Sequence, residues 1–177
     1  SPVERMPLVE VIRGRQTGDT ALAHALDFVA QLKKTPILVN DSRGFFTSRF
    51  IGAFINEGVT MVKEGINPAL IENAARMTGY PVGALTISDE IGLDLAYKGA
   101  QQQAQDLGAD NRPGASVEVI ATMVATHGRH GRKNGKGFYE YAADGGKRLW
   151  PGLDDLWPRR PASEQPDVRE VQHRMLY

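Results

Sequence analysis

The sequence contains no cysteine, no excess of charge of either sign and no long hydrophobic run, and each absence excludes a class of protein. Without cysteine the chain forms no disulfide and performs no thiol chemistry, which fits a reducing compartment. Its 21 basic and 21 acidic side chains cancel, so no net field attracts it to nucleic acid or to an anionic membrane. We therefore expect neither of these as a partner.

Apolar residues never continue for the roughly 20 positions that a membrane-spanning helix needs. The N-terminus also lacks the charged and then apolar profile of a secretory signal peptide. We expect no membrane insertion and a location in the bacterial cytoplasm.

Motifs with well-understood chemistry are also scarce. No G-x-G-x-x-G follows a strand and opens a helix, so a dinucleotide site is not complete within these residues. Phosphate-loop, zincin and α/β-hydrolase motifs are missing as well. His127 and His130 lie three residues apart in a glycine-rich basic segment, which favours solvated loop residues over metal ligands. We predict no metal site.

The first forty residues have the pattern of a strand, a helix and a second strand. Residues 8–12 and 36–40 are short runs of β-favouring apolar residues. Between them, apolar side chains recur at helical spacing over residues 22–32, after a cap at Asp19 or Thr20. This unit predicts a parallel or mixed α/β sheet. Two strands do not make a stable sheet, so we interpret the segment as the last part of a larger domain.

Helical signals dominate after residue 40. Asp41 and Ser42 are suitable N-caps for a long helix whose apolar stripe includes Phe45 and continues until Gly65. The dipeptide Asn67-Pro68 begins a second helix. We predict further helices from an acidic first turn at residues 88–90 to about residue 107, at residues 116–126 and at residues 167–177, with one strand at residues 138–141.

Glu10 needs an explanation beyond folding. In a strand, Leu8, Glu10 and Ile12 point to one face, so a carboxylate lies between two aliphatic side chains. Burial of an unpaired carboxylate is costly or raises its pKa until it protonates. The simpler interpretation is an ion pair with Arg13 or Arg5, or a place at an exposed sheet edge. The alternative is a histidine partner, which the carboxylate orients and whose cationic form it stabilises.

Three stretches resemble one enzyme family. They are SPVERMPLVEVI at residues 1–12, NDSRGFFTSR at residues 40–49 and KNGKGFYEY at residues 133–141. The second contains Asp-x-x-Gly-Phe and an arginine, with Ala53-Phe54 shortly after it. Together they resemble the 3-hydroxyacyl-CoA dehydrogenases of fatty-acid β-oxidation, over residues 1 to about 141.

The resemblance implies roles for four residues. Glu10 falls on the glutamate of the catalytic His-Glu dyad, whose histidine precedes the position of Ser1 by three residues, in an His-Phe-Phe sequence. Ser48 stands where the family usually has an asparagine that contacts the substrate and the histidine. Ser1 stands where an asparagine often contacts NAD, and Lys133 where a lysine reaches this cofactor. Without the resemblance, Lys133 would be taken for a solvated loop lysine.

The resemblance also implies a fold and a domain layout. The fold is mainly α, namely the C-terminal helical domain of the 6-phosphogluconate/3-hydroxyacyl-CoA dehydrogenase type, preceded by a strand-helix-strand remnant of a Rossmann domain. We expect the NAD-binding remnant at residues 1–40, the helical domain at 41–142, and a linker with the start of a second helical repeat at 143–177. This layout resembles the multifunctional enzymes that carry an enoyl-CoA hydratase domain upstream. The chain is then a piece of a longer enzyme and is inactive alone, since it lacks the histidine and the glycine-rich NAD loop.

The implied reaction of the intact enzyme is oxidation of an L-3-hydroxyacyl-CoA by NAD, which is bound mainly by the upstream domain. Histidine removes the 3-hydroxyl proton while a hydride leaves for the nicotinamide, and the 3-oxoacyl-CoA product passes to a thiolase. The expected partners are therefore an acyl-CoA and a thiolase. Unpaired strand edges and uncovered apolar faces within residues 1–40 also predict self-association.

Two alternatives stay open. A β-hydroxyacid or 6-phosphogluconate type dehydrogenase would use a lysine base on the long helix, but the nearest lysine, Lys63, lies near the far end of that helix. The other alternative is a non-catalytic helical module for dimerisation or partner docking.

Overall fold

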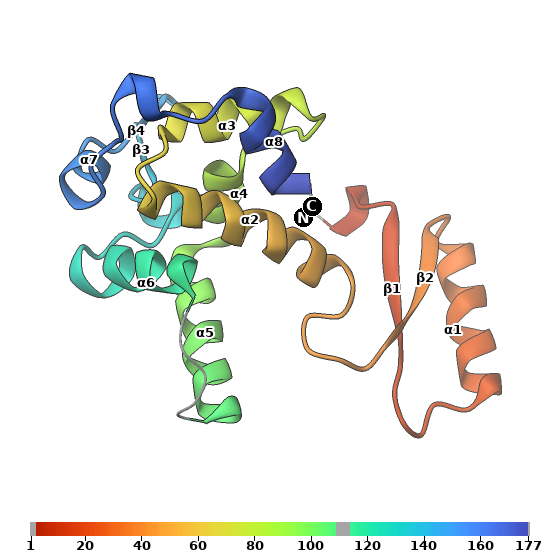
Figure 1. Cartoon of the computed structure of the whole chain (residues 1–177). Helices are drawn as coiled ribbons and strands as arrows, with labels where there is room; N and C mark the ends of the chain where they lie inside the picture. The colour runs from red at the N-terminus through yellow and green to blue at the C-terminus, as the bar shows by residue number, and fades with distance from the viewer. Residues whose placement is uncertain (1–2, 109–113, 177) are drawn as a thin grey trace. The chain divides into compact units, whose positions relative to one another are not determined.

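A parallel pair of strands with one crossover helix makes up the first part of the chain (Figure 1). The computed structural model describes residues 3–108 and 114–176, which divide into two units, Ser1–Gly52 and Ala53–Tyr177. In the first unit a short 3-10 turn, Val3–Arg5, leads to β1 (Leu8–Arg13), α1 (Asp19–Gln31) and β2 (Thr35–Asn40). This order confirms the predicted strand, helix and strand.

The two strands pair in register from Leu8 opposite Thr35 to Arg13 opposite Asn40. The helix α1 contacts both strands, and its Val29 is buried. Its N-cap is Gly18, without a side-chain hydrogen bond, so the predicted cap at Asp19 or Thr20 is wrong.

The long helix begins later than the sequence suggests. α2 spans Thr47–Lys63, and residues 41–46 form a turn in which Gly44 and Phe45 have φ angles of +75° and +46°. A left-handed backbone does not continue into a right-handed helix. Asp41 and Ser42 are therefore not its N-caps, and Phe45 lies outside it.

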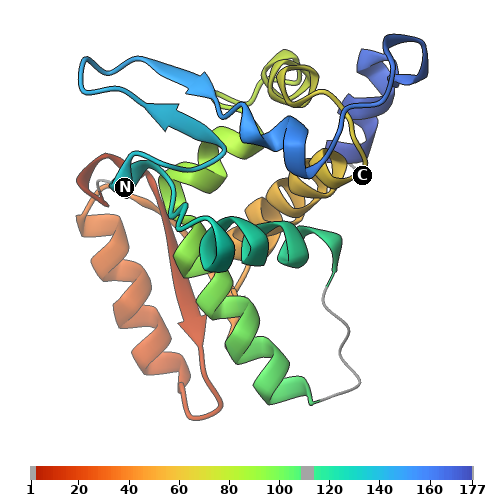
Figure 2. The ribbon, with the colours of Figure 1, turned by 90° about the vertical axis from the view of Figure 1, so that its left-hand side faces the viewer.

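The second unit is mainly helical and also contains a β-hairpin. Its helices after α2 are α3 (Pro68–Met77), α4 (Ala84–Ile91), α5 (Leu93–Leu107), α6 (Ala115–Ala121), the π-helical turn η2 (Thr122–Thr126), the 3-10 turn η3 (Arg132–Asn134), α7 (Gly152–Leu156), the 3-10 turn η4 (Ala162–Glu164) and α8 (Val168–Leu176). The antiparallel strands β3 (Tyr139–Tyr141) and β4 (Lys147–Leu149) form the hairpin, which is visible in Figure 2.

Several predicted helices hold and others need correction. Asn67 caps α3 as predicted, since its Oδ1 accepts a hydrogen bond from the Ala69 amide at 3.0 Å. Asp89 and Glu90, however, lie inside α4 rather than in a first turn, and the predicted helix from residues 88–90 to residue 107 is divided at Gly92 into α4 and α5. The predicted helix 116–126 continues beyond α6 as a π-helical turn. The short β4 and α7 were not predicted.

The last segment packs onto the helices of its own unit. α8 contacts α3, and its Val171 and Met175 are buried. Arg174 of α8 forms ion pairs with Glu57 at 2.5 Å and with Glu64 at 2.6 Å. The predicted start of a second helical repeat within residues 143–177 stays a prediction.

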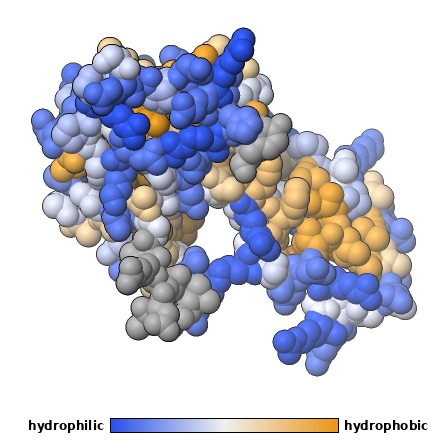
Figure 3. All heavy atoms as spheres, in the orientation of Figure 1, coloured by the Kyte–Doolittle hydropathy of each residue, from blue (hydrophilic) through white to orange (hydrophobic). Residues whose placement is uncertain are grey.

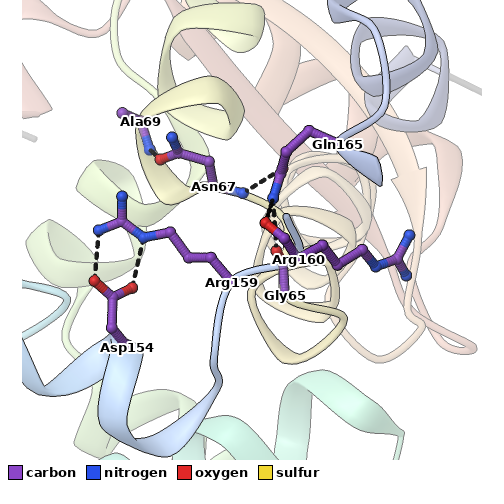
Figure 4. Close-up of polar contacts among 7 residues, drawn as sticks. All are labelled: Gly65, Asn67, Ala69, Asp154, Arg159, Arg160 and Gln165. Atoms are coloured by element: carbon purple, nitrogen blue, oxygen red, sulfur yellow. Dashed lines mark hydrogen bonds and ion pairs between the residues drawn. The ribbon is translucent and has the colours of Figure 1, made fainter. Parts of the chain in front are cut away.

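Gln165 anchors the approach to α8 (Figure 4). Its Nε2 donates to the carbonyl oxygen of Gly65 at 3.1 Å and to that of Arg160 at 2.9 Å, while its Oε1 accepts from the Asn67 amide at 2.9 Å. One amide side chain thus satisfies backbone groups on both sides of the turn between α2 and α3.

Among the helices of the described residues, none is long and apolar enough to cross a lipid bilayer.

Candidate functional site

Glu10 lies in the middle of β1, and its carboxylate holds the N-terminal end of α2. Oε1 accepts hydrogen bonds from the backbone amides of Phe46 at 2.8 Å and Thr47 at 3.0 Å. Oε2 accepts from the Thr47 hydroxyl at 2.6 Å. The first turn of a helix leaves its amides without intrahelical partners, so an anion is favourable there.

These hydrogen bonds stabilise the charged form of Glu10. They lower its pKa, with the Thr47 hydroxyl as the largest cause and desolvation acting in the opposite direction. Glu10 is therefore a carboxylate at neutral pH. Arg13, which the sequence offered as a partner for Glu10, instead forms an ion pair with Asp19 at 3.5 Å.

Ser48 follows Thr47 directly and lies in the first turn of α2, where it is exposed. The bonds from Thr47 to Glu10 therefore hold β1 at the helix end that carries Ser48. Two residues that are far apart in the sequence, Glu10 and Ser48, are brought to one place in the first unit. The sequence did not reveal this, because the contact depends on Thr47, which no pattern marked as functional.

A cavity of about 620 Å³ lies close to this helix end. It combines aromatic side chains with two arginines, and its lining residues are Arg13, Leu38, Val39, Asn40, Ser42, Phe45, Phe46, Arg49 and Phe50. All of them belong to the first unit. Apolar walls with a few polar groups are typical of small-molecule sites.

Lys133 belongs to the second unit, in the short turn η3. Its Nζ lies 2.5 Å from Oδ2 of Asp94, in the first turn of α5, and lowers the pKa of that carboxyl. Lys133 is thus an ion-paired residue rather than a freely solvated one. Its predicted contact with NAD stays a prediction, and Ser1, the other predicted cofactor residue, lies outside the described residues.

Two buried carboxylates in the second unit were not identified as important from the sequence. Asp89 Oδ1 accepts from the Phe138 amide at 2.8 Å, and Oδ2 accepts from the Tyr139 amide and the Tyr141 hydroxyl, both at 3.0 Å. Burial raises the pKa of Asp89 to about 6, because these bonds only partly offset the loss of solvation. The arrangement joins α4 to the Gly-Phe-Tyr segment at residues 137–139.

Glu72 of α3, like Glu10, accepts hydrogen bonds from backbone amides at the start of another helix. It accepts from the amides of Leu85 at 2.7 Å and Thr86 at 3.2 Å, at the start of α4, and from the Tyr139 hydroxyl at 2.9 Å. Its side chain is only 2% exposed, so this network is internal and serves packing. In the described part of the chain, no group of three or more candidate side chains is placed to hold a metal ion.

Comparison with known families decides what this arrangement belongs to. Residues 44–141 match the family described as 3-hydroxyacyl-CoA dehydrogenase, C-terminal domain, and residues 1–42 match the NAD binding domain of the same enzymes. This chain belongs to the 3-hydroxyacyl-CoA dehydrogenase family. The match confirms the predicted fold, a family helical domain preceded by a short Rossmann-like part, and it names NAD as the cofactor of the N-terminal domain.

The curated relatives are long proteins. The chain is 38% identical over 143 residues to the fatty acid oxidation complex subunit alpha of Shewanella sp. strain ANA-3, a match that covers 81% of this chain. It is 37% identical over 149 residues to the subunit alpha of Shewanella loihica, covering 84% of this chain. In both cases the chain spans about a fifth, 20%, of the relative's length.

Solved structures of the dehydrogenase family share the fold. The (S)-3-hydroxybutyryl-CoA dehydrogenase of Ralstonia eutropha is 34% identical with a TM-score of 0.70, over 80% of this chain and 50% of that one. The 3-hydroxybutyryl-CoA dehydrogenase of Escherichia coli K12 is 26% identical with a TM-score of 0.68, over 78% and 29%. The dehydrogenase part of multifunctional enzyme 1 from C. elegans, at 23% identity and a TM-score of 0.66, shares the fold over 97% of this chain and 38% of its own.

Proposed function

We propose that this chain is part of an NAD-dependent L-3-hydroxyacyl-CoA dehydrogenase, in which Glu10 orients the catalytic histidine and Ser48 binds the substrate. One observation carries the proposal: three hydrogen bonds hold Glu10 as a carboxylate at the helix end where Ser48 lies. The matches of residues 1–42 and 44–141 to the two domains of this family support the same reading. The lysine base of the alternative enzyme type has little support, since Lys63 is the last residue of α2 and pairs with Glu118.

The chemistry follows from the charge of Glu10. A fixed carboxylate bonded to one imidazole nitrogen leaves the other nitrogen free to take the proton of the 3-hydroxyl group. Glu10 then offsets the positive charge that develops on the imidazole, and a base positioned in this way contributes about 10²–10⁴-fold to the rate. Ser48 would donate a hydrogen bond to the oxygen on C3. NAD, when bound, supplies the hydride acceptor.

The test is Glu10→Gln in the full-length gene product that contains this chain. We expect kcat for reduction of acetoacetyl-CoA by NADH to fall at least about tenfold, with the Kd of NADH nearly unchanged. Asp27→Asn is the matched control, because Asp27 is an exposed carboxylate on α1 of the same unit. An unchanged kcat in Glu10→Gln would leave Glu10 with a purely structural role.

The wider setting of the enzyme is also a proposal. The relatives' names support a subunit of a fatty acid oxidation complex. From the family resemblance we further propose a location in the bacterial cytoplasm, a thiolase as partner and an enoyl-CoA hydratase domain upstream. Hydration of crotonyl-CoA by the full-length gene product would test the hydratase domain. Co-purification of a co-expressed thiolase would test the partner.

Lys133 is proposed to contact NAD, for which it would exchange its bond with Asp94. Lys133→Gln in the full-length enzyme should weaken NADH binding. Lys136→Gln, a change of the neighbouring exposed lysine, should not.

Self-association through the first unit is the remaining proposal. Apolar residues gather over β1 and β2 (Figure 3), and Leu8, Ile12 and Leu38 are 37%, 40% and 49% exposed. Leu8 and Ile12 lie on one face of the strand pair and Leu38, opposite Val11, on the other, so both faces carry exposed apolar side chains of the kind that mark association sites.

A further inference from the structure

Thr47 contacts Glu10 through two different groups. Its backbone amide donates to Oε1 at 3.0 Å, and its side-chain hydroxyl donates to Oε2 at 2.6 Å. The Phe46 amide also donates to Oε1, at 2.8 Å. Oε1 is therefore held by backbone alone, whatever side chains stand at positions 46 and 47, whereas the bond to Oε2 requires a hydroxyl.

We propose that Thr47 is a positioning residue for the dehydrogenase reaction, whose hydroxyl fixes Oε2 of Glu10 and thereby sets the plane and the acceptor strength of the carboxylate toward the catalytic histidine. The inference rests on the proposed function of Glu10. Two amides on one oxygen fix the position of Oε1 but leave Oε2 able to pivot about it. A third donor on the other oxygen removes that freedom, because both oxygens then have fixed partners.

The electrostatics point the same way. The Thr47 hydroxyl is the largest cause of the lowered pKa of Glu10, followed by the Thr47 amide, with desolvation opposing and the Phe46 amide adding a smaller effect. Among the described residues, no charged side chain is one of these causes. Loss of the hydroxyl therefore makes the carboxylate more basic, and a more basic carboxylate stabilises an imidazolium beside it.

The experiment compares Thr47→Val with Thr47→Ser in the full-length enzyme. We measure kcat for oxidation of L-3-hydroxybutyryl-CoA across pH, where the fall at low pH reports protonation of the base. In Thr47→Val this fall should move to higher pH by about half to one unit, with KM within about twofold of wild type. Thr47→Ser, which keeps the hydroxyl, should restore the wild-type profile.

Two further variants complete the design. Thr122→Val removes a comparable hydroxyl bond, from Thr122 to the Glu118 carbonyl at 2.9 Å, outside the candidate site, and should leave the profile unchanged. Thr47→Ala removes the same hydroxyl and leaves a smaller side chain. It is used in place of Thr47→Val if the valine variant does not fold.

The outcomes separate the two proposals. If Glu10→Gln lowers kcat while Thr47→Val and Thr47→Ala keep the wild-type pH profile, the inference about Thr47 is wrong and the function of Glu10 stands. If Glu10→Gln also has wild-type kcat and pH profile, the proposed function itself fails. A shift in Thr47→Val that Thr47→Ser does not reverse would show that packing, not the hydroxyl, is responsible, and would overturn the inference.

Discussion

Three carboxylates, Glu10, Glu72 and Asp89, accept hydrogen bonds from backbone amides outside their own helix or strand. The surroundings of Glu10 and Asp89 shift their pKa values in opposite directions. Hydrogen bonds outweigh desolvation at the half-buried Glu10 and lower its pKa, whereas burial dominates at Asp89 and raises its pKa. Hydrogen bonds from backbone amides to a carboxylate therefore stabilise the ionised Glu10 at the candidate site, and they join α4 to β3 at Asp89.

Ser48 gives the first prediction. If its hydroxyl binds the substrate oxygen, Ser48→Ala in the full-length enzyme should remove one hydrogen bond and cost about 1–3 kcal/mol of transition-state stabilisation, measured from kcat/KM. Ser48→Asn should be tolerated. Ser163→Ala, at an exposed serine of η4, is the control. A neutral alanine together with a harmful asparagine would show that Ser48 serves the packing of α2.

Asp89 gives the second prediction, which concerns pH. Its pKa is about 6 in the folded chain against an ordinary 3.8, so the folded chain holds this proton more tightly. Its contribution to the free energy of unfolding is therefore fully present below the ordinary pKa and is lost as the pH rises through about 6. The lost part is about 3 kcal/mol.

Urea unfolding of the 177-residue chain at several pH values between about 4 and 7 measures this effect. The free energy of unfolding of the wild type should fall as the pH rises, because Asp89 loses its proton. Asp89→Asn has no carboxyl at this position, so this fall should be absent from its curve, and the lost hydrogen-bond acceptor should lower its stability at every pH. Parallel pH curves for the two proteins would contradict the prediction.

At the scale of elements, the sequence predicted the existence of most helices and strands, and their ends less well. The apolar pattern of β1, α1 and β2 and the Asn67-Pro68 start of α3 were sufficient, because periodicity and caps are local signals. The start of α2 was misplaced because a left-handed Phe45 has no sequence signal. Asp89 was assigned to a first turn because of its charge, and its partners at residues 138–141 leave no local signal in the sequence.

The candidate site was predictable only in part. The resemblance marked Glu10 and Ser48 one by one, but their joint position at the start of α2 depends on a contact between β1 and Thr47. Such long-range contacts leave no local pattern in a single sequence. The ion pair of Lys133 with Asp94 was missed for the same reason.

The third prediction concerns the joint between α4 and β3. A Cβ atom at Gly137 would lie 2.0 Å from Oδ1 of Asp89, so the backbone approaches the carboxylate closely only because residue 137 is glycine. Gly137→Ala should destabilise the chain by about 1–3 kcal/mol, as overpacking of a core does.

Gly99→Ala on α5 is the matched control, since nothing lies within 4 Å of a Cβ there. Alanine in an exposed helix should stabilise by about 0.5–1 kcal/mol, so the two variants should change the urea midpoint in opposite directions. An equal change of the urea midpoint in both variants would show that the backbone at residue 137 and the Asp89 side chain move apart at little cost.

At the scale of the whole molecule, the fourth prediction is that the 177-residue chain self-associates and does not turn over acetoacetyl-CoA with NADH. Association follows from the exposed Leu8, Ile12 and Leu38, and inactivity from the missing base and glycine-rich loop. Light scattering over a concentration series should show a mean mass that rises with concentration. Leu38→Lys should lower this mass, whereas the control Met77→Lys, at an exposed apolar residue of α3, should not.

A monomer at all concentrations would refute self-association, and turnover above a heat-killed control would refute inactivity.

The ties of α8 have a consequence for biosynthesis. Val171 and Met175 fill the interior of the second unit, and Arg174 reaches back to Glu57 and Glu64, more than a hundred positions earlier in the chain. Domains generally acquire their structure as units while the ribosome elongates the chain, the N-terminal ones first. β1, α1 and β2 have all their mutual partners once residue 40 has emerged. In the helical unit, by contrast, the surface of α3 that α8 covers stays uncovered until residue 175 has left the ribosome, and during this interval a chaperone or a protease can bind there.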